Sequence, residues 1–287
     1  MSSPLVSVVI PAYNRPDTLK IAIESVLDQT YPEIEIIICD DSSDNRVQEM
    51  LVPYLSSNPQ IKYYKNENNL FLKNWQKCYD LASGEYINYL MDDDVFHKDK
   101  IKKMMYFFTE FENITLVTSY RQLINETGEP LAPIPATNRL YHETRIIDGK
   151  LLANYALKHC LNVIGEPTTV LFRKKDLTEP FGIYHGKQYS LINDLAAWLN
   201  LLAKGKAVYI PEALSYFRLH QSQNSNILGQ ETFSQWLDII IDSRIDGFLD
   251  TNELYKTALH TYRERVKSFH PFIEDVKRID EILQTLK

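Results

Sequence analysis

The chain has 287 residues, which is enough for one large domain or two small ones with a substantial core. Hydrophobic residues make up 44% of it, and its 18 tyrosines and 12 phenylalanines exclude an intrinsically disordered chain. A formal net charge of −7 excludes nucleic acid as a main partner, because binding to a phosphate backbone needs a basic surface.

The cysteines and the lengths of the apolar runs indicate a cytoplasmic protein. Cys39, Cys78 and Cys160 are scattered and odd in number, which fits reduced thiols better than a disulfide framework or a zinc site. No stretch of the sequence approaches about 18 uninterrupted apolar residues, the length that indicates a membrane-spanning helix. We therefore expect a cytoplasmic protein that is at most peripheral at a membrane.

Short apolar strands alternate with helical patterns in the first third of the chain. Residues 5–10 are rich in β-branched side chains and end at Pro11, which predicts a buried strand. The next segment opens with Pro16 and has the i, i+3, i+4 spacing of an amphipathic helix. Further segments of both kinds follow, with strands at 34–39, 61–64 and 86–91 and a helix around 75–82. This alternation predicts a parallel sheet with helices on both faces.

Polar residues follow three of these strands. They are residues 11–14 after the first strand, Asp40 and Asp41 after the second, and Asp92, Asp93 and Asp94 after the fourth. In open sheets of this kind ligands bind beyond the carboxyl ends of the strands, so we expect these residues to share one crevice. Adjacent carboxylates repel each other, and a positive partner is therefore expected beside the three aspartates. A solvated acidic turn that caps the following helix is the alternative.

The pattern becomes less regular after the three aspartates. A helix is predicted around 101–108, and strands are predicted at 116–121 and 168–173. Residues 125–145 are rich in Pro, Asn, Thr and Glu, which predicts a long loop between these strands. Long loops of this kind often act as lids or bind an acceptor.

The last third of the chain is predicted to be mainly helical. A helix begins at Asp194, and only helical patterns follow Gln221. We therefore divide the chain into an α/β domain over residues 1–220 and a C-terminal helical extension over residues 221–287. The extension carries an apolar stripe, which is expected to dock on the domain or on a second subunit and so allows a homo-oligomer.

Three separated segments resemble glycosyltransferase family 2. They are VSVVIPAYNRPDTLKIAIESVLDQTYPEIEIIICDDSSD at 6–44, ASGEYINYLMDDD at 82–94 and INDLAAWLNLLAKGKAVYIPEALSYFRLH at 192–220. The first resembles the opening of that family, the second its Asp-x-Asp segment, and the third its Glu-Asp helix and terminal Arg-x-His. The three segments occur in the same order as in the family, and the resemblance covers roughly residues 5–220. The resemblance implies a GT-A fold, which is Rossmann-like with a mostly parallel central sheet and helices on both faces.

The resemblance also implies a metal-bound nucleotide sugar. A divalent cation, Mn²⁺ or Mg²⁺, would bridge the diphosphate to a carboxylate and neutralise the leaving group. By resemblance Asp93 is the direct metal ligand, Asp92 contacts the ribose, and Asp94 shares either role. His220 stands where the family often supplies a further metal ligand. Many members carry an aspartate where this chain has Met91, which leaves open which aspartate takes which role.

The remaining expected site residues belong to the nucleobase and to the acceptor. Asp41 is expected to accept a hydrogen bond from the base, which favours the ring N–H of uracil and hence a UDP-sugar. Asp194 is expected to be the general base that deprotonates the acceptor hydroxyl in an inverting attack. The family's preceding glutamate is replaced by Asn193, and an N-cap is the alternative role for Asp194. The wall against which the base packs is expected at Pro11, Ala12 and Tyr13.

We therefore predict a metal-dependent inverting glycosyltransferase that moves a hexose or N-acetylhexosamine to a glycan, lipid-linked or protein-linked acceptor. The segment Gly165, Glu166 and Pro167 lies near the donor sugar in the family, or forms a simple turn. A nucleotidyltransferase would need a glycine-rich basic loop after the first strand, which residues 11–17 do not supply. A non-catalytic nucleotide-sugar-binding module with the same fold is the remaining alternative.

Overall fold

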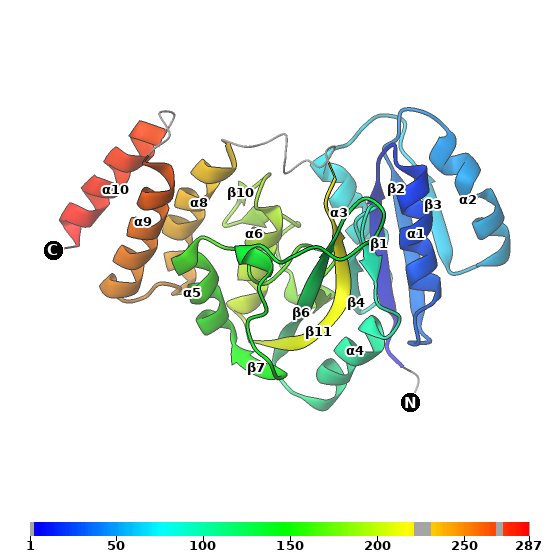
Figure 1. Cartoon of the computed structure of the whole chain (residues 1–287), viewed down its shortest axis with the longest axis horizontal. Coiled ribbons are helices and arrows are strands. Elements are labelled where there is room, and N and C mark those ends of the chain that lie inside the picture. Colours follow the sequence, from blue (N-terminus) through cyan, green and yellow to red (C-terminus); the bar gives the residue numbers. More distant parts are fainter. Residues whose placement is uncertain (1–2, 221–230, 268–271, 287) are drawn as a thin grey trace.

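The computed structural model describes residues 3–220, 231–267 and 272–286, and its elements form layers around a central sheet (Figure 1). Within this part of the chain the sheet has nine strands in the order β3-β2-β1-β4-β8-β6-β11-β5, with β7 paired to β11. The strands are β1 (Val6–Ala12), β2 (Ile34–Asp40), β3 (Ile61–Lys65), β4 (Tyr86–Tyr89), β5 (Val95–Phe96), β6 (Ile114–Ile124), β7 (Arg145–Asp148), β8 (Leu171–Arg173) and β11 (Lys206–Arg218). A separate hairpin consists of β9 (Ile183–Tyr184) and β10 (Lys187–Gln188).

The sheet is mostly parallel, as the alternation of strands and helices predicted. Strands β1 to β4 pair in parallel with one another, and β6 pairs in parallel with β11. The short strand β8 lies antiparallel between β4 and β6, and it begins at Leu171 rather than at residue 168. The residues before β8 leave the ladder, and the Thr168 hydroxyl accepts from the backbone N–H of Met91 and donates to the Asp94 carboxylate, just after β4.

Helices cover both faces of the sheet. They are α1 (Pro16–Leu27), α2 (Arg46–Ser57), α3 (Leu72–Leu81), α4 (Lys100–Glu110), α5 (Gly149–His159), α6 (Asn193–Leu202), α8 (Glu231–Asp242), α9 (Asn252–Val266) and α10 (Ile273–Thr285), with 3-10 turns η1 (Pro135–Thr137), η2 (Lys174–Asp176) and η3 (Ser243–Asp246). Successive side chains of a strand point to opposite faces. Val8 therefore joins the core under α1, α2 and α4, and Val9 joins the core under α3, α5 and α6.

Within residues 125–160 the structure has one strand and one helix that were not predicted from the sequence. The predicted loop over 125–145 contains η1 and ends where β7 begins, and α5 follows β7 directly. Helix α5 starts at an N-cap, because the Asp148 carboxylate accepts hydrogen bonds from two backbone N–H groups of its first turn. Its buried face is formed by Leu152, Ala153, Ala156 and Leu157.

The C-terminal helices pack on the sheet domain at one end of the molecule (Figure 1). Leu237 and Ile240 of the apolar stripe on α8 belong to the same core as Trp198 of α6. Hydrogen bonds tie the β9–β10 hairpin to this region, from Tyr189 Oη to Asp242 at 2.6 Å and from Tyr184 Oη to Asp246 at 2.7 Å. The predicted docking of the stripe on the domain is thus observed. The domain boundary at 220 stays a prediction, since residues 221–230 lie outside the described residues, and so does the expected homo-oligomer.

A lysine lies fully inside the protein at the start of α4. The side chain of Lys100, in the first turn of α4, is 0% exposed, and its Nζ donates a hydrogen bond to the carbonyl oxygen of Thr169 at 3.0 Å. The same nitrogen lies 4.9 Å from the ring centroid of Phe96. Burial lowers the pKa of this amine well below its usual value, because an apolar interior disfavours the charged form.

We predict that Lys100→Met changes the pH dependence of stability. The unfolded chain carries a charged lysine below its unfolded pKa of about 10.4, and the folded chain carries a neutral one above its lowered pKa. Unfolding therefore takes up a proton between these two values, and the wild type gains about 1.4 kcal/mol of stability per pH unit relative to Lys100→Met. Urea unfolding at pH 7, 8 and 9 measures this difference. Parallel profiles for the two proteins would show that the folded lysine stays charged.

Candidate active site

The ends of β1, β2 and β4 meet at one edge of the sheet. The backbone N–H of Tyr13 donates to Asp92 Oδ2 at 2.9 Å, which joins the end of β1 to the segment after β4. The backbone N–H of Asp41 donates to the carbonyl of Ala12 at 2.9 Å, which joins β1 to the end of β2. The polar segments that the sequence analysis expected in one crevice are therefore in contact, across 79 positions of sequence for Tyr13 and Asp92.

The three consecutive aspartates are all buried. Asp92, Asp93 and Asp94 are 5%, 6% and 0% exposed, so a solvated acidic turn is excluded. Burial, and then the charge of Asp93, raises the pKa of Asp92 to about 7, against the opposing effect of the Arg15 guanidinium. The same two causes raise the pKa of Asp94 well above its usual value.

Arg15 supplies the positive partner that the adjacent carboxylates require. Its Nη1 lies 3.0 Å from Asp92 Oδ1 and 3.0 Å from Asp93 Oδ2. The residue sits in the loop between β1 and α1, immediately before Pro16 begins the helix. No role was predicted for Arg15 from the sequence, where its only signal is a positive charge among the polar residues that follow the first strand.

Asp93 and Asp94 differ in what they face. Asp93 Oδ2 lies 2.8 Å from His220 Nε2, at the end of β11, in addition to its contact with Arg15. Both oxygens of Asp94 are engaged inside the protein, one by the Thr168 hydroxyl at 2.5 Å and the other by the backbone N–H of Arg218 at 2.9 Å. The structure thus brings the three expected metal residues together and uses Asp94 as an internal acceptor.

Arg218 fixes the backbone of the acidic segment. Its side chain is 4% exposed, and its Nε donates to the carbonyl oxygen of Asp93 at 2.8 Å. Its Nη1 donates to the carbonyls of Asn125 and Glu126 at 3.1 and 2.9 Å, at the start of the predicted 125–145 loop. The first residue of the Arg-x-His motif therefore contacts backbone carbonyl groups, and the last residue, His220, contacts the carboxylate of Asp93.

The expected nucleobase residues lie beside this cluster. Asp41 accepts hydrogen bonds from Asn66 Nδ2 at 2.6 Å and from the backbone N–H of Leu70 at 3.1 Å, and its carboxylate still has lone pairs for a ligand. The ring of Tyr13 is 47% exposed, while Ala12 is buried. Asp40 is fully buried and accepts from the Ser42 N–H and the Tyr63 hydroxyl, both at 2.8 Å, so its role is structural.

Asp194 lies in the first turn of α6 with a strongly perturbed carboxyl group. Burial raises its pKa to about 7 and the charge of Glu166 adds to this, whereas the Leu195 N–H and Asn162 oppose it. Asp194 Oδ2 accepts from Asn162 Nδ2 at 2.7 Å, and Oδ1 accepts from the backbone N–H of Leu195 at 2.7 Å. Helix α6 begins at Asn193 with Ile192 at its N-cap position, so the alternative N-cap role for Asp194 is not observed.

The segment 165–167 is held against α6 and β6. The carbonyl oxygen of Gly165 accepts a hydrogen bond from Trp198 Nε1 at 2.8 Å, and Glu166 forms an ion pair with the buried Arg121 at 2.5 Å. Gly165 has a φ of 125°, and an added Cβ there would lie 2.8 Å from the Cβ of Thr169. The charge of Glu166 acts on Asp194, and the Thr169 N–H donates to the Glu166 carbonyl at 2.8 Å, so the segment forms a turn. Its expected position near the donor sugar stays a prediction.

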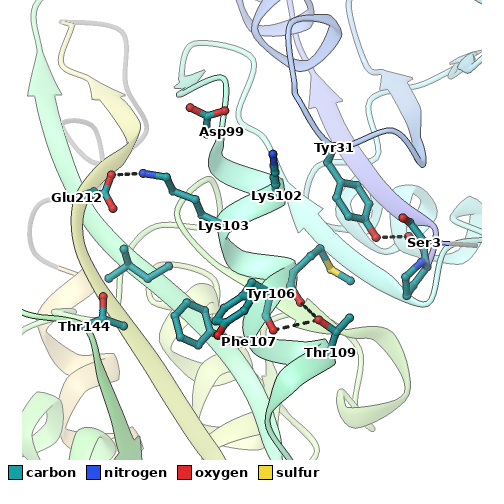
Figure 2. A pocket seen from close by; sticks show the side chains of 13 residues that line it. Ser3, Tyr31, Asp99, Lys102, Lys103, Tyr106, Phe107, Thr109, Thr144 and Glu212 are labelled. Carbon is teal, nitrogen blue, oxygen red and sulfur yellow. Dashed lines mark hydrogen bonds and ion pairs between the residues drawn. The ribbon is translucent and has the colours of Figure 1, made fainter. Parts of the chain in front are cut away.

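A cavity of about 870 Å³ lies away from the acidic cluster (Figure 2). Lys102, Lys103 and Tyr106 of α4 line it, together with N-terminal residues and part of β11. Lys103 pairs there with Glu212, and Tyr106 is 54% exposed. Asp92, Asp93, Asp94 and Asp194 do not line this cavity.

The donor set at the acidic edge fits a divalent cation that is shared with a ligand. In the described part of the chain, no group of three His, Cys, Asp or Glu side chains converges as a complete metal site. Asp93 Oδ2 and His220 Nε2, 2.8 Å apart, offer one oxygen and one nitrogen donor. Two protein ligands leave room for phosphate oxygens and water, as is usual where Mg²⁺ or Mn²⁺ meets a nucleotide.

We predict that Arg15→Gln destabilises the fold by about 1–3 kcal/mol at pH 8, because the buried Asp92 and Asp93 lose a charged partner. Urea unfolding measures the change. Arg46→Gln is the matched control, because it breaks an ion pair with Asp44 in which both side chains are exposed, and a change below about 0.5 kcal/mol is expected. Equal effects of the two substitutions would contradict a compensating role for Arg15.

Comparison with known proteins agrees with this geometry. The sequence model "Glycosyl transferase family 2" matches residues 7–177. The chain is 33% identical over 226 residues to the putative teichuronic acid biosynthesis glycosyltransferase TuaG of Bacillus subtilis, covering 78% of this chain and 82% of that protein. It is 31% identical over 224 residues to the Escherichia coli UDP-Glc:alpha-D-GlcNAc-diphosphoundecaprenol beta-1,3-glucosyltransferase WfaP, covering 75% and 78% of the two chains.

A solved structure shows the same fold. The crystal structure of S. aureus TarS 1-349 in complex with UDP-GlcNAc matches with a TM-score of 0.65 at 17% identity, over 98% of this chain and 90% of that one. The likeness supports the GT-A fold that the sequence motifs implied. With the family match over more than half of its length, the chain belongs to glycosyltransferase family 2 and is a glycosyltransferase of the GT-A fold.

Proposed function

We propose that the chain is a metal-dependent inverting transferase that moves a hexose or N-acetylhexosamine from a UDP-sugar to an acceptor hydroxyl. The observation that carries the proposal is the contact between Asp93 Oδ2 and His220 Nε2 at 2.8 Å. It joins residues 127 positions apart at the edge of the sheet where parallel α/β folds bind ligands. A carboxylate and an imidazole held together in this way suit a cation that neutralises a diphosphate.

The donor nucleotide is proposed to lie over the ends of β1 and β2. Asp41 would accept the ring N–H of uracil, while Pro11, Ala12 and Tyr13 would pack against the base. Asp92, whose Oδ2 is fixed by the Tyr13 N–H, would contact the ribose. The name of WfaP includes UDP-Glc, and the similar TarS structure holds UDP-GlcNAc, which supports UDP as the nucleotide without deciding the sugar.

Asp93 and His220 are proposed to hold Mn²⁺ or Mg²⁺, with Asp94 orienting the segment through its bonds to Thr168 and Arg218. When bound, the ion would stabilise the negative charge that develops on the leaving diphosphate. Arg15 contacts Asp92 and Asp93, so its positive charge compensates these two carboxylates in the protein without a bound cation. The protein thus keeps the acidic segment folded in a form that can accept a cation.

Asp194 is proposed to take the proton of the acceptor hydroxyl as that oxygen forms a bond to the anomeric carbon. The bond from the anomeric carbon to the diphosphate oxygen breaks in the same step, so the configuration inverts. A base with a pKa of about 7 is partly ionised at neutral pH and still basic enough to accept the proton. The position of Asp194 beside Glu166 and Asn162 supports this assignment.

The acceptor is proposed to be a glycan, a lipid-linked sugar or a glycoprotein, reached by a cytoplasmic enzyme at the membrane surface. The names of WfaP and of a second Escherichia coli relative, the glucosyltransferase WfgD, include diphosphoundecaprenol, which supports a lipid-linked glycan. Among the residues that the structure describes, no helix has the length and apolarity needed to span a bilayer. Membrane contact would then be peripheral.

We predict that Asp93→Ala abolishes the Mn²⁺-dependent part of UDP binding, because it removes the carboxylate that meets His220. Calorimetric titration of UDP, with and without Mn²⁺, on both proteins measures this. Asp280→Ala is the matched control, because it removes an exposed carboxylate on α10 that pairs with Arg263. Equal UDP affinity of the wild type with and without Mn²⁺ would overturn the metal dependence.

We predict that Asp194→Asn lowers the transfer rate by about 10²- to 10⁴-fold and leaves UDP affinity unchanged, because the substitution removes only the basic oxygen. The wild-type rate should rise with pH through about 7 as this carboxyl group ionises. Release of UDP with saturating acceptor measures both effects. Asp148→Asn, at the N-cap of α5, is the control that should keep the rate. A pH-independent Asp194→Asn enzyme of nearly full rate would exclude Asp194 as the base.

A further inference from the structure

One phenylalanine at the edge of the proposed base site has an unfavourable backbone conformation. Phe71 has φ 50° and ψ −124°, and the carbonyl of Leu70 accepts a hydrogen bond from the Lys73 N–H at 3.0 Å. This is a tight turn with Phe71 at its second position, in the conformation of a type II′ turn, where glycine is strongly preferred. A bulky aromatic residue is strained there, because its Cβ crowds the backbone.

The strain of Phe71 is not offset by burial of its side chain. The residue is 74% exposed, which leaves most of a phenyl ring in water. Among the other non-glycine residues with positive φ that the structure describes, Asn14, Asn113 and His185 are of types that tolerate this region, and Cys160 and Leu249 are buried. Phe71 therefore combines a strained backbone with an exposed aromatic ring. Such residues concentrate at ligand-binding positions.

The turn that holds Phe71 also holds Asp41. The backbone N–H of Leu70, directly before Phe71, donates to Asp41 Oδ2 at 3.1 Å. The Phe71 N–H donates to Asn69 Oδ1 at 2.8 Å, which fixes the turn from the other side. Helix α3, which begins at this turn, packs against β1 and β2 (Figure 1). The exposed ring of Phe71 and the exposed ring of Tyr13 are thus both attached to elements that contact Asp41.

We propose that Phe71 stacks on the nucleobase of the nucleotide donor, as a second aromatic contact besides Tyr13. The inference rests on the proposed function, in which Asp41 accepts the ring N–H of the base. Stacking is tolerant of base identity because every base has a π-face, so Phe71 contributes affinity while Asp41 contributes the choice of base. Binding of the nucleobase would bury the phenyl ring, which is 74% exposed in the structure. This burial would offset part of the strain in the turn.

The test compares UDP with ribose 5-diphosphate, which lacks the base, by calorimetric titration in the presence of Mn²⁺. Phe71→Ala and Phe71→Gly should weaken UDP binding by about 5- to 150-fold and leave ribose 5-diphosphate within about twofold. Phe71→Tyr and Phe71→Trp should keep UDP affinity. The melting temperature of Phe71→Gly should stay at or above that of the wild type, because glycine suits the turn. Phe111→Ala, which truncates another exposed aromatic ring after α4, is the matched control and should bind UDP normally.

Three outcomes would overturn the inference in distinguishable ways. Unchanged UDP affinity in Phe71→Ala would leave the donor site intact and remove Phe71 from it. An equal loss for UDP and ribose 5-diphosphate would show that Phe71 acts through the fold of the loop and not on the base. A wild-type protein that binds no UDP with Mn²⁺ would overturn the proposed function, and the role of Phe71 would fail with it.

Discussion

Three adjacent buried carboxylates at the end of β4 have to be compensated, and much of the active-site edge is arranged to do so. Taking a carboxylate out of water is strongly unfavourable unless it is paired or hydrogen-bonded. Arg15 arrives from the β1–α1 loop, His220 from the end of β11, and Thr168 from the segment before β8. The three residues come from different parts of the chain. Their contacts with the aspartates therefore also connect the two halves of the sheet.

The compensation divides the aspartates into two kinds. Asp94 is satisfied by Thr168 and by the Arg218 N–H, and it serves the structure. Asp92 and Asp93 are neutralised by the side chain of Arg15, which is partly exposed and reaches both through one nitrogen. Asp92 and Asp93 can therefore exchange the partly exposed guanidinium of Arg15 for a metal cation that arrives with a ligand. Asp94 cannot bind such a cation without losing its internal hydrogen bonds and disturbing the fold.

The helical extension takes part in the same architecture through α6. The side-chain amide of Gln235 on α8 accepts from the Leu191 N–H and donates to the Ser190 hydroxyl, both at 3.0 Å. These residues lie just before Asp194, and the extension shares its apolar core with α6. The C-terminal helices look separate from the α/β domain in the sequence. In the structure they support the segment that carries Asp194, the proposed general base.

The sequence by itself determined the alternating strands and helices, the polar strand ends and the family motifs, because periodicity and neighbouring residues are local properties. Residues Asp41, Asp92, Asp93, Asp194 and His220 could be named as a candidate site on those grounds. The tertiary structure alone decided the pairing of Arg15 with Asp93 across 78 positions, the internal role of Asp94, the antiparallel course of β8 and the pKa of Asp194. These depend on desolvation and on contacts between distant segments, which no local pattern encodes.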